Sequence, residues 1–557
     1  MNKTKFIIFI LICSSFSAKS QKGGIKKDSL YFKPVYKDQS AAWDSMNRAN
    51  MPHFTIDSGA VKAAKTINSM DLKKTLFKIA SEEFQGRETG HKGQKLAENY
   101  ISNQFKSFGL KPAGDNGTYV QNFEVIEDTL AQIDIETNSK KYIHLKDYYS
   151  YLRLNHSDSL QTDKIYFAGY GIDAPEYSNY KGKDMTGQVV MICTGEPKLN
   201  DSTYLIGGEN NPSSWSSSWD LKLKTATKMG ATSILIVIDG SIEDEVNSNL
   251  RITAEPMHLA TDTLTRKHFS NVYYISKSMA STIFAQAGKN YDGTIKKMER
   301  KQKPVNEKLK VKTLIVYKKI GVPLTSSNVA GIVEGTDKKD EVVIITAHYD
   351  HLGMHNGQIY YGADDDGSGT TAVLELAKTF ARAEKLGYKP HRTILFMCFS
   401  GEEKGLIGSE YYCRHPLLPL ENTVVDLNID MIGRLDTTHE RTQVQNYVYI
   451  IGDNKLSSEL RPISEKANNT YLNMELNYKY NNNSDPNHFY SRSDHYNFAK
   501  RGIPVIFYFN GNHEDYHKPT DVVNKINFSK LYLTTELVFY TAWDIANREK
   551  RIMLDKK

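Results

Sequence analysis

Apolar side chains change their spacing along this chain, and each spacing predicts a different kind of structure. Within residues 66–144 they recur every three or four positions, which indicates two amphipathic helices. Asn68 or Ser69 is expected to cap the first helix, and Gly109 is expected to end the second. The predicted apolar faces consist of Leu72, Leu76 and Ile79 in one helix and of Ala97, Ile101, Phe105 and Phe108 in the other.

Residues 145–320 show short β-like runs separated by loops rich in serine and asparagine. The runs include "KIYFAGYGI", "GQVVMICTG", "TSILIVIDG" and "NVYYISKSM". We interpret this segment as a separate inserted domain that is mostly β, with a few helices such as the one through "WDLKLKTATKMGA".

Residues 321–557 alternate continuous apolar runs with helical stretches. Runs such as "EVVIITAH", "RTILFMCFSG" and "IPVIFYFNG" are typical of parallel strands that are buried on both faces. Residues 66–144 and 321–557 together therefore predict an α/β fold with a doubly wound, mostly parallel sheet and helices on both faces. In such folds functional sites form beyond the carboxyl ends of the strands.

The start of the chain has a different character. Residues 1–20 combine a basic start, the apolar run "FIIFILIC" and the small residues "AKS", a pattern that predicts a cleaved secretory signal peptide. Residues 21–65 are polar without clear periodicity and are expected to form an irregular extension. At 557 residues the chain exceeds a single ordinary core, which agrees with several domains.

Composition excludes several classes of partner. No later segment approaches 18 consecutive apolar residues, so no membrane contact is expected after signal cleavage. Loss of the three signal lysines lowers the net charge from +6 to +3, too weak a bias to indicate nucleic-acid binding. The remaining cysteines, Cys193, Cys398 and Cys413, are too few for a disulfide framework, and the first two lie in apolar runs.

Polar residues gather where the predicted strands of residues 321–557 end. His348 and Asp350 project to the same face of the first of these strands because side chains two residues apart in a strand do so. Glycines in the turn "ADDDGSG" allow the backbone to come close to whatever the aspartates hold. The other strand ends contribute Glu402, Glu403, Asp430, His513 and His517.

So many carboxylates in one cleft need compensating charge. Unpaired buried ions raise one another's pKa and cost several kcal/mol each, and no comparable cluster of lysine or arginine accompanies them. Divalent cations are the natural partners, and a mixed histidine and carboxylate set favours zinc, with manganese or cobalt as substitutes. The supply of ligands suffices for two ions that share a bridging carboxylate.

The segment "HEDYH", His513 to His517, matches the H-E-x-x-H zinc signature, which requires a helix. Its surroundings predict a loop instead. Asn510, Gly511 and Asn512 precede it, and Pro519 follows, so helical geometry is disfavoured. We therefore expect one of its histidines to bind metal from a loop.

Taken together these motifs resemble the co-catalytic di-zinc aminopeptidases of metallopeptidase family twenty-eight, which are related to glutamate carboxypeptidase and the transferrin receptor ectodomain. The resemblance covers "GRETGHKG" and the chain from "SNVAGIVEGTDKKDEVVIITAHYDHLG" onward. The segment "FAGYGIDAPEYSNYKGKDMTGQVVMI" resembles the protease-associated (PA) domain that is often inserted in these enzymes.

The resemblance also implies a ligand set. By motif, His348 and Asp430 hold one zinc ion, Glu403 and His517 hold the other, and Asp365 bridges the two. From the residues themselves, Asp350 is expected to accept the second ring N–H of His348. Glu402, adjacent in sequence to Glu403, is free to act as the general base.

Other polar residues near these motifs have simpler interpretations. Asp494 is interpreted as a helix cap. The remaining histidines are expected to be structural or to lie at the rim of the site: His351, His355, His495 and His513.

The expected function is that of an exported zinc aminopeptidase, periplasmic or extracellular, which acts on peptides. Two alternatives stay open: a carboxypeptidase or dipeptidase on the same scaffold, and a non-catalytic receptor-like ectodomain. A carboxypeptidase would need a cationic pocket, and no arginine cluster is apparent. The preferred side chain and the oligomeric state are not specified by the sequence.

Overall fold

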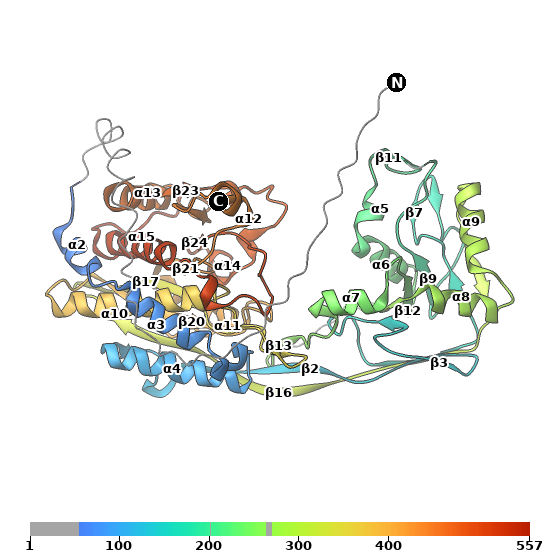
Figure 1. Cartoon of the computed structure of the whole chain (residues 1–557), viewed down its shortest axis with the longest axis horizontal. Coiled ribbons are helices and arrows are strands. Elements are labelled where there is room, and N and C mark those ends of the chain that lie inside the picture. Colours follow the sequence, from blue (N-terminus) through green and yellow to red (C-terminus); the bar gives the residue numbers. More distant parts are fainter. Residues whose placement is uncertain (1–54, 201, 263–269, 557) are drawn as a thin grey trace, which may run out of the picture. The chain divides into compact units, whose positions relative to one another are not determined.

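Four strands with continuous apolar runs form the parallel centre of a twelve-stranded sheet in the computed structural model (Figure 1). They follow the order β20 (Arg392–Phe399), β17 (Lys338–His348), β21 (Thr423–Ile429) and β24 (Val505–Phe509). Each neighbouring pair is parallel, whereas β16 (Thr313–Val333) and β22 (Tyr447–Ile451) flank this centre in antiparallel orientation. The predicted mostly parallel sheet is confirmed at its centre, and its edges make it a mixed sheet.

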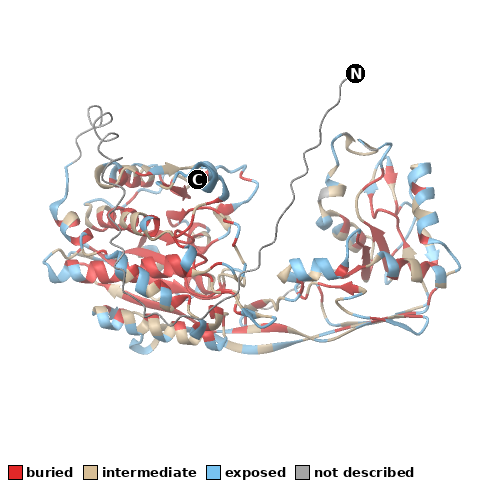
Figure 2. Cartoon of the chain, viewed as in Figure 1, coloured by how far each residue is buried: buried red, intermediate tan, exposed pale blue. Residues whose placement is uncertain are grey.

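Helices cover both faces of this sheet, as predicted. Val343 and Ile345 of β17 pack in the core on one face of the sheet, and Val342 and Ile344 pack in the core on the opposite face. Figure 2 shows the central strands as buried. The helices that pack in the core with Val343 are α2 (Ser58–Ala64), α3 (Ser69–Ile79), α4 (Lys92–Phe108), α10 (Gly367–Lys385), α13 (Leu460–Tyr471) and α15 (Phe528–Asn547). The helices that pack in the core with Val342 are α11 (Ile407–Arg414) and α14 (His495–Ala499).

The ends of the first two predicted helices are confirmed. Asn68 caps α3 by accepting hydrogen bonds from the backbone N–H groups of Met70 and Asp71. Gly109 ends α4 in the left-handed conformation, with φ of 89°.

The structure describes residues 55–200, 202–262 and 270–556. The predicted signal peptide and residues 21–54 of the predicted extension lie outside this part. The expectation of irregular structure up to residue 65 is wrong for α2, which Asp57 caps. Its buried face consists of glycine and alanine, Gly59, Ala60, Ala63 and Ala64, which give only a weak hydrophobic signal in the sequence.

The inserted segment has a six-stranded sheet of its own, in the order β15-β6-β9-β12-β14-β4. Its four central strands are parallel, and separate apolar clusters join α8 and α9 to one face and α6 and α7 to the other. The predicted helix through "WDLKLKTATKMGA" is confirmed as α6, and further helices cover both faces of the sheet, as parallel strands buried on both faces require. The elements are β6 (Ile165–Phe167), β9 (Val189–Cys193), β12 (Ser233–Val237), β14 (Asn271–Ile275), α6 (Trp219–Lys228), α7 (Ile242–Ser248), α8 (Lys277–Gln286) and α9 (Tyr291–Lys301), edged by β4 (Tyr148–Tyr149) and β15 (Glu307–Leu309).

Two long strands connect the segments. β2 (Val120–Thr137) pairs with β16 along almost its whole length, with an irregularity at Lys318/Lys319. Tyr317 of β16 packs in a core of the insert, whereas Val329 packs in the core of the large sheet. The position 320/321, where we expected one domain to end, lies inside β16, so paired strands connect the segments.

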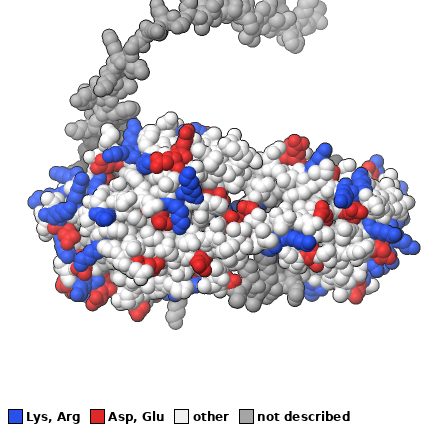
Figure 3. Space-filling view, turned by 90° about the horizontal axis from the view of Figure 1, so that it is seen from below, with Lys and Arg blue, Asp and Glu red and all other residues white. Residues whose placement is uncertain are grey.

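Surface and membrane features add little to this picture. No helix among the described residues is long and apolar enough to cross a membrane. On the face drawn in Figure 3, basic and acidic side chains are interspersed. Cys193 and Cys398 are buried and free, as expected for small apolar residues, and Cys413 is buried and free as well.

Candidate metal centre

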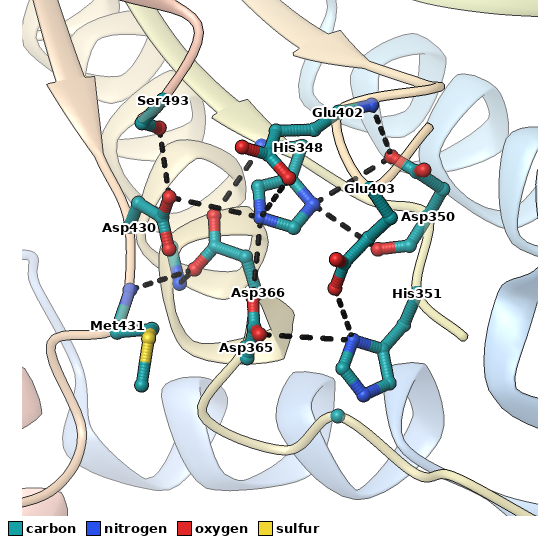
Figure 4. A network of polar contacts seen from close by, with 12 residues as sticks. His348, Asp350, His351, Asp365, Asp366, Glu402, Glu403, Asp430, Met431 and Ser493 are labelled. Atoms are coloured by element: carbon teal, nitrogen blue, oxygen red, sulfur yellow. Dashed lines mark hydrogen bonds and ion pairs between the residues drawn. The ribbon is translucent and has the colours of Figure 1, made fainter. Parts of the chain in front are cut away.

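The ends of the parallel strands and the loops beside them bring six polar side chains to one place. His348 is the last residue of β17, Glu402 and Glu403 follow β20, and Asp430 follows β21. Asp365 lies in the turn before α10, and His517 lies in the loop after β24. Figure 4 shows His348, Asp365, Glu402, Glu403 and Asp430 pointing toward one another. The residues that the sequence singled out, far apart along the chain, therefore converge.

The distances divide the site into two halves. On one side, His348 Nε2 lies 3.3 Å from Asp365 Oδ1 and 3.7 Å from Asp430 Oδ2. On the other, His517 Nε2 lies 3.0 Å from Asp365 Oδ2 and 3.2 Å from Glu403 Oε2. Asp365 thus presents one carboxylate oxygen to each half, which is the arrangement of a bridging ligand. Below, His348 and Asp430 are called the buried half, and His517 and Glu403 the open half.

Burial and charge shift the pKa values of these groups strongly. Burial alone would lower the pKa of His348, but the surrounding carboxylates, first Glu402, raise it well above the usual value. Burial would also lower the pKa of His517, but Glu403 and Asp365 raise this pKa to about 10. Burial, aided by Glu403 and Asp430, raises the pKa of Glu402 well above its normal range. These shifts express the electrostatic cost of placing the carboxylates together.

The donor atoms fit a metal better than they fit one another. His348 Nε2 is buried and faces three carboxylates, yet it makes no hydrogen bond of proper geometry among the described residues. Histidine nitrogens and carboxylate oxygens are the usual ligands of zinc outside cysteine sites. Two groups of such atoms, each within 4.8 Å of one another, occur here. The cluster is therefore a candidate metal centre.

Asp350 supports the site differently from expectation. The ring Nδ1 of His348 lies 3.1 Å from the backbone carbonyl of Asp350 and 3.6 Å from its carboxylate, so the hydrogen bond goes to the main chain. The carboxylate instead accepts hydrogen bonds from Thr89 Oγ1 at 2.7 Å and from the backbone N–H of Glu402 at 3.3 Å. Asp350 thereby connects His348 to the segment that carries Glu402.

Two residues of the cluster were not assigned to it from the sequence. His351, which we expected to be structural or at the rim, is buried, and its Nδ1 lies 2.8 Å from Glu403 Oε1 and 4.0 Å from Asp365 Oδ2. Asp366 also lies close, but its carboxylate accepts backbone hydrogen bonds from Gly369, Met431 and His348. Asp366 therefore organises the main chain, whereas His351 belongs to the open half.

Other expectations are partly corrected. Asp494 is buried and precedes α14, but its side chain makes no capping hydrogen bond; burial raises its pKa to about 7. "HEDYH" is a loop and turn, which confirms that the helical zinc signature is absent there. His513 faces Asp364 at 3.3 Å, and His495 hydrogen bonds to the Tyr490 carbonyl, so both have structural contacts. His355 packs edge-on against Tyr360.

The motif "GRETG" holds the loops of the site together. Arg87 is fully buried, and its guanidinium donates to the carbonyls of Tyr349, Tyr361, Gly362 and Ile79 at 2.7 to 2.9 Å. Burial lowers its pKa to about 10. A single side chain therefore fixes the segment after His348 to the segment before Asp365.

Close packing requires a glycine at one point of this framework. A Cβ at Gly369 would lie 2.3 Å from the Ile429 carbonyl, beside Asp430. The absence of a side chain lets the start of α10 approach the end of β21.

Histidines and carboxylates gathered at the strand ends of an α/β sheet form a donor set that is suited to metal ions. Residues 328–542 match the model described as Peptidase family M28. Aminopeptidase YwaD of Bacillus subtilis (strain 168) is 28% identical over 243 residues, which cover 42% of this chain and 48% of that protein.

A probable glutamate carboxypeptidase of Arthroderma benhamiae is 42% identical over 105 residues, 19% of this chain and 14% of that protein. The chain thus spans about half or less of the length of these curated relatives. The solved aminopeptidase from Aneurinibacillus sp. strain AM-1 has a TM-score of 0.55 at 19% identity, covering 89% of this chain and 98% of that one. This last likeness concerns the fold.

Proposed function

We propose that this protein is an exported aminopeptidase that holds two zinc ions and removes N-terminal residues from peptides. The observation that carries the proposal is Asp365, which offers one oxygen to His348 and Asp430 and the other to His517 and Glu403. The signal-like pattern of residues 1–20 supports export. The M28 family match and a relative named as an aminopeptidase support the reaction class.

In this proposal His348, Asp430, Glu403 and His517 hold the ions, and Asp365 bridges them. Bound zinc would supply a Lewis acid that polarises the peptide carbonyl and lowers the pKa of water. Glu402 takes a proton from the attacking water and later donates it to the leaving amine. Its backbone N–H is fixed on Asp350, so the segment is held in place.

The test compares peptides blocked at either end. The zinc-loaded protein should release the first residue of a C-amidated peptide and should leave the N-acetylated form of the same peptide intact. A chelator should abolish cleavage, and added zinc should restore it. Cleavage of the N-acetylated peptide from its C-terminus would favour the carboxypeptidase alternative, and zinc binding without any cleavage would favour the receptor-like one.

A further inference from the structure

A pocket opens directly beside the candidate metal centre. It is small, with a cavity volume of about 30 Å³. Its walls differ in character: one is acidic, one is apolar, and one carries an arginine. The acidic wall is Asp365, Glu402 and Asp430, the apolar wall is Met431, Phe489, Phe507 and Phe509, and Arg492, Asn512 and Tyr516 complete the lining.

Arg492 is held in place by uncharged groups. Its guanidinium carbon lies 4.9 Å from the centre of the Phe489 ring, and Nη2 donates to Tyr516 Oη at 3.2 Å. Stacking on an aromatic ring and one hydrogen bond restrict the side chain before any ligand arrives.

Arg492 lacks an acidic partner within the described part of the chain. No carboxylate there lies within 4.0 Å of its guanidinium, although three carboxylates line the same pocket. Arg434, by contrast, forms an ion pair with Asp515 at 3.1 Å, and Arg461 pairs with Asp453 at 2.8 Å. The one hydrogen bond to Tyr516 leaves most N–H donors of Arg492 open.

The remaining N–H donors of Arg492 determine which kind of ligand it can bind. A planar guanidinium binds a carboxylate through paired, charge-assisted hydrogen bonds. The pocket thus has two proposed metal ligands and the proposed base on one side, apolar rings suited to methylene groups, and a cation suited to an acidic group. This combination matches a substrate that carries a carboxylate close to the bond that is cleaved.

We propose that Arg492 is a specificity-determining residue that binds a carboxylate of the substrate. The inference rests on the proposed function and adds the substrate class to it. The carboxylate belongs either to the side chain of an N-terminal aspartate or glutamate or to the free C-terminus of a dipeptide. Both sources use the same recognition chemistry, and substrates that carry only one of them distinguish the two.

The experiment measures kcat and KM of the zinc-loaded wild type and variants on matched substrates. The anilides of glutamate, leucine and lysine test the side-chain source, and Leu-Leu with a free or an amidated C-terminus tests the terminal source. Arg492→Gln removes the charge, Arg492→Lys keeps it, and Arg492→Glu reverses it. Arg441→Gln changes an exposed arginine outside the pocket and serves as the control.

The wild type should prefer one acidic substrate over its neutral match by about tenfold or more. Arg492→Gln should remove that preference through KM while cleavage of the leucine anilide changes less than about threefold. Arg492→Lys should retain part of the preference, and Arg492→Glu should improve cleavage of the lysine anilide.

Equal loss on acidic and neutral substrates in Arg492→Gln would overturn the inference, as would a wild type that cleaves without acidic preference. In both cases the proposed function would stand. If the zinc-loaded wild type cleaved none of these substrates, the proposed function would fail and this inference would fail with it.

Discussion

The two halves of the candidate metal centre are built from the same residue types but in different environments. In the buried half, the His348 side chain is 1% exposed, and His348 is the last residue of the central strand β17. In the open half, the His517 side chain is 31% exposed and lies in a turn, with φ of 56°. The same ligand chemistry is thus placed once on a rigid strand end and once on a loop.

The supporting contacts differ accordingly. Asp430 accepts a hydrogen bond from Ser493 at 2.7 Å, and Ser493 in turn accepts one from Asn428 of β21. His517 is supported mainly by stacking on Tyr516, with ring centres 3.9 Å apart, while His351 contacts its partner Glu403. Sites on regular elements are held more precisely than sites on loops. We therefore expect the buried half to bind its ion more tightly than the open half.

The largest expected effect comes from the proposed general base, Glu402, which belongs to neither half. Glu402→Gln should lower kcat by about 1000-fold, because the amide cannot accept the proton of the attacking water. Zinc content should stay unchanged, since Glu402 is not among the proposed ligands. Kinetics and metal analysis of the same preparation test this. Activity within tenfold of the wild type, or loss of zinc, would contradict the assigned role.

The next effect separates the halves. His348→Ala and His517→Ala should each weaken one zinc site by more than about 100-fold, because removal of a ligand should exceed the 10–100-fold cost of removing its supporting residue. His348→Ala should also lower the thermal stability clearly, since it leaves buried carboxylates unpaired. His517→Ala should lower it less, because solvent reaches that position. Zinc analysis after dialysis and thermal melts provide the comparison, and equal melting temperatures would refute the asymmetry.

The sequence predicted the buried half better than the open half, for a physical reason. Continuous apolar runs located β17, β20 and β21, and polar residues at their ends follow directly from strand geometry. His351 lies beyond the end of β17, where the alternation of side chains in a strand no longer predicts which way a side chain points. His351 forms a parallel bridge with Glu88, and no local pattern reveals a partner 263 residues away in the chain.

The insert shows the same limit. Its parallel strands were recognised as apolar runs, but the face of α9 that packs on them offers only Tyr291 and Met298 as buried residues. So few apolar positions give only a weak helix signal in the sequence. The helix is recognised from its packing on the sheet, which the sequence does not show.

Residues that support one half should affect that half alone. Ser493→Ala should weaken the buried half by about tenfold, and His351→Gln should weaken the open half by a similar factor, as is usual for groups that orient metal ligands. Zinc titration of the metal-free protein in competition with a chromogenic chelator measures both affinities. His355→Gln is a matched control for His351, because His355 lies outside the cluster. Equal weakening of both halves by either variant would show that they act as one unit.

The smallest effect tests how far the support of the buried half extends. Thr89 donates to Asp350 from the "GRETG" motif and is fully buried. Thr89→Val keeps the shape and leaves one oxygen of Asp350 without its partner, so the free energy of unfolding should fall by about 1–3 kcal/mol. Because Asp350 also accepts from the backbone of Glu402, kcat should fall about threefold to tenfold while zinc affinity in the open half stays constant. Thr89→Ser, which restores the hydroxyl, should recover kcat; if Thr89→Ser were as slow as Thr89→Val, packing of the methyl group rather than the hydrogen bond would hold Asp350 in place.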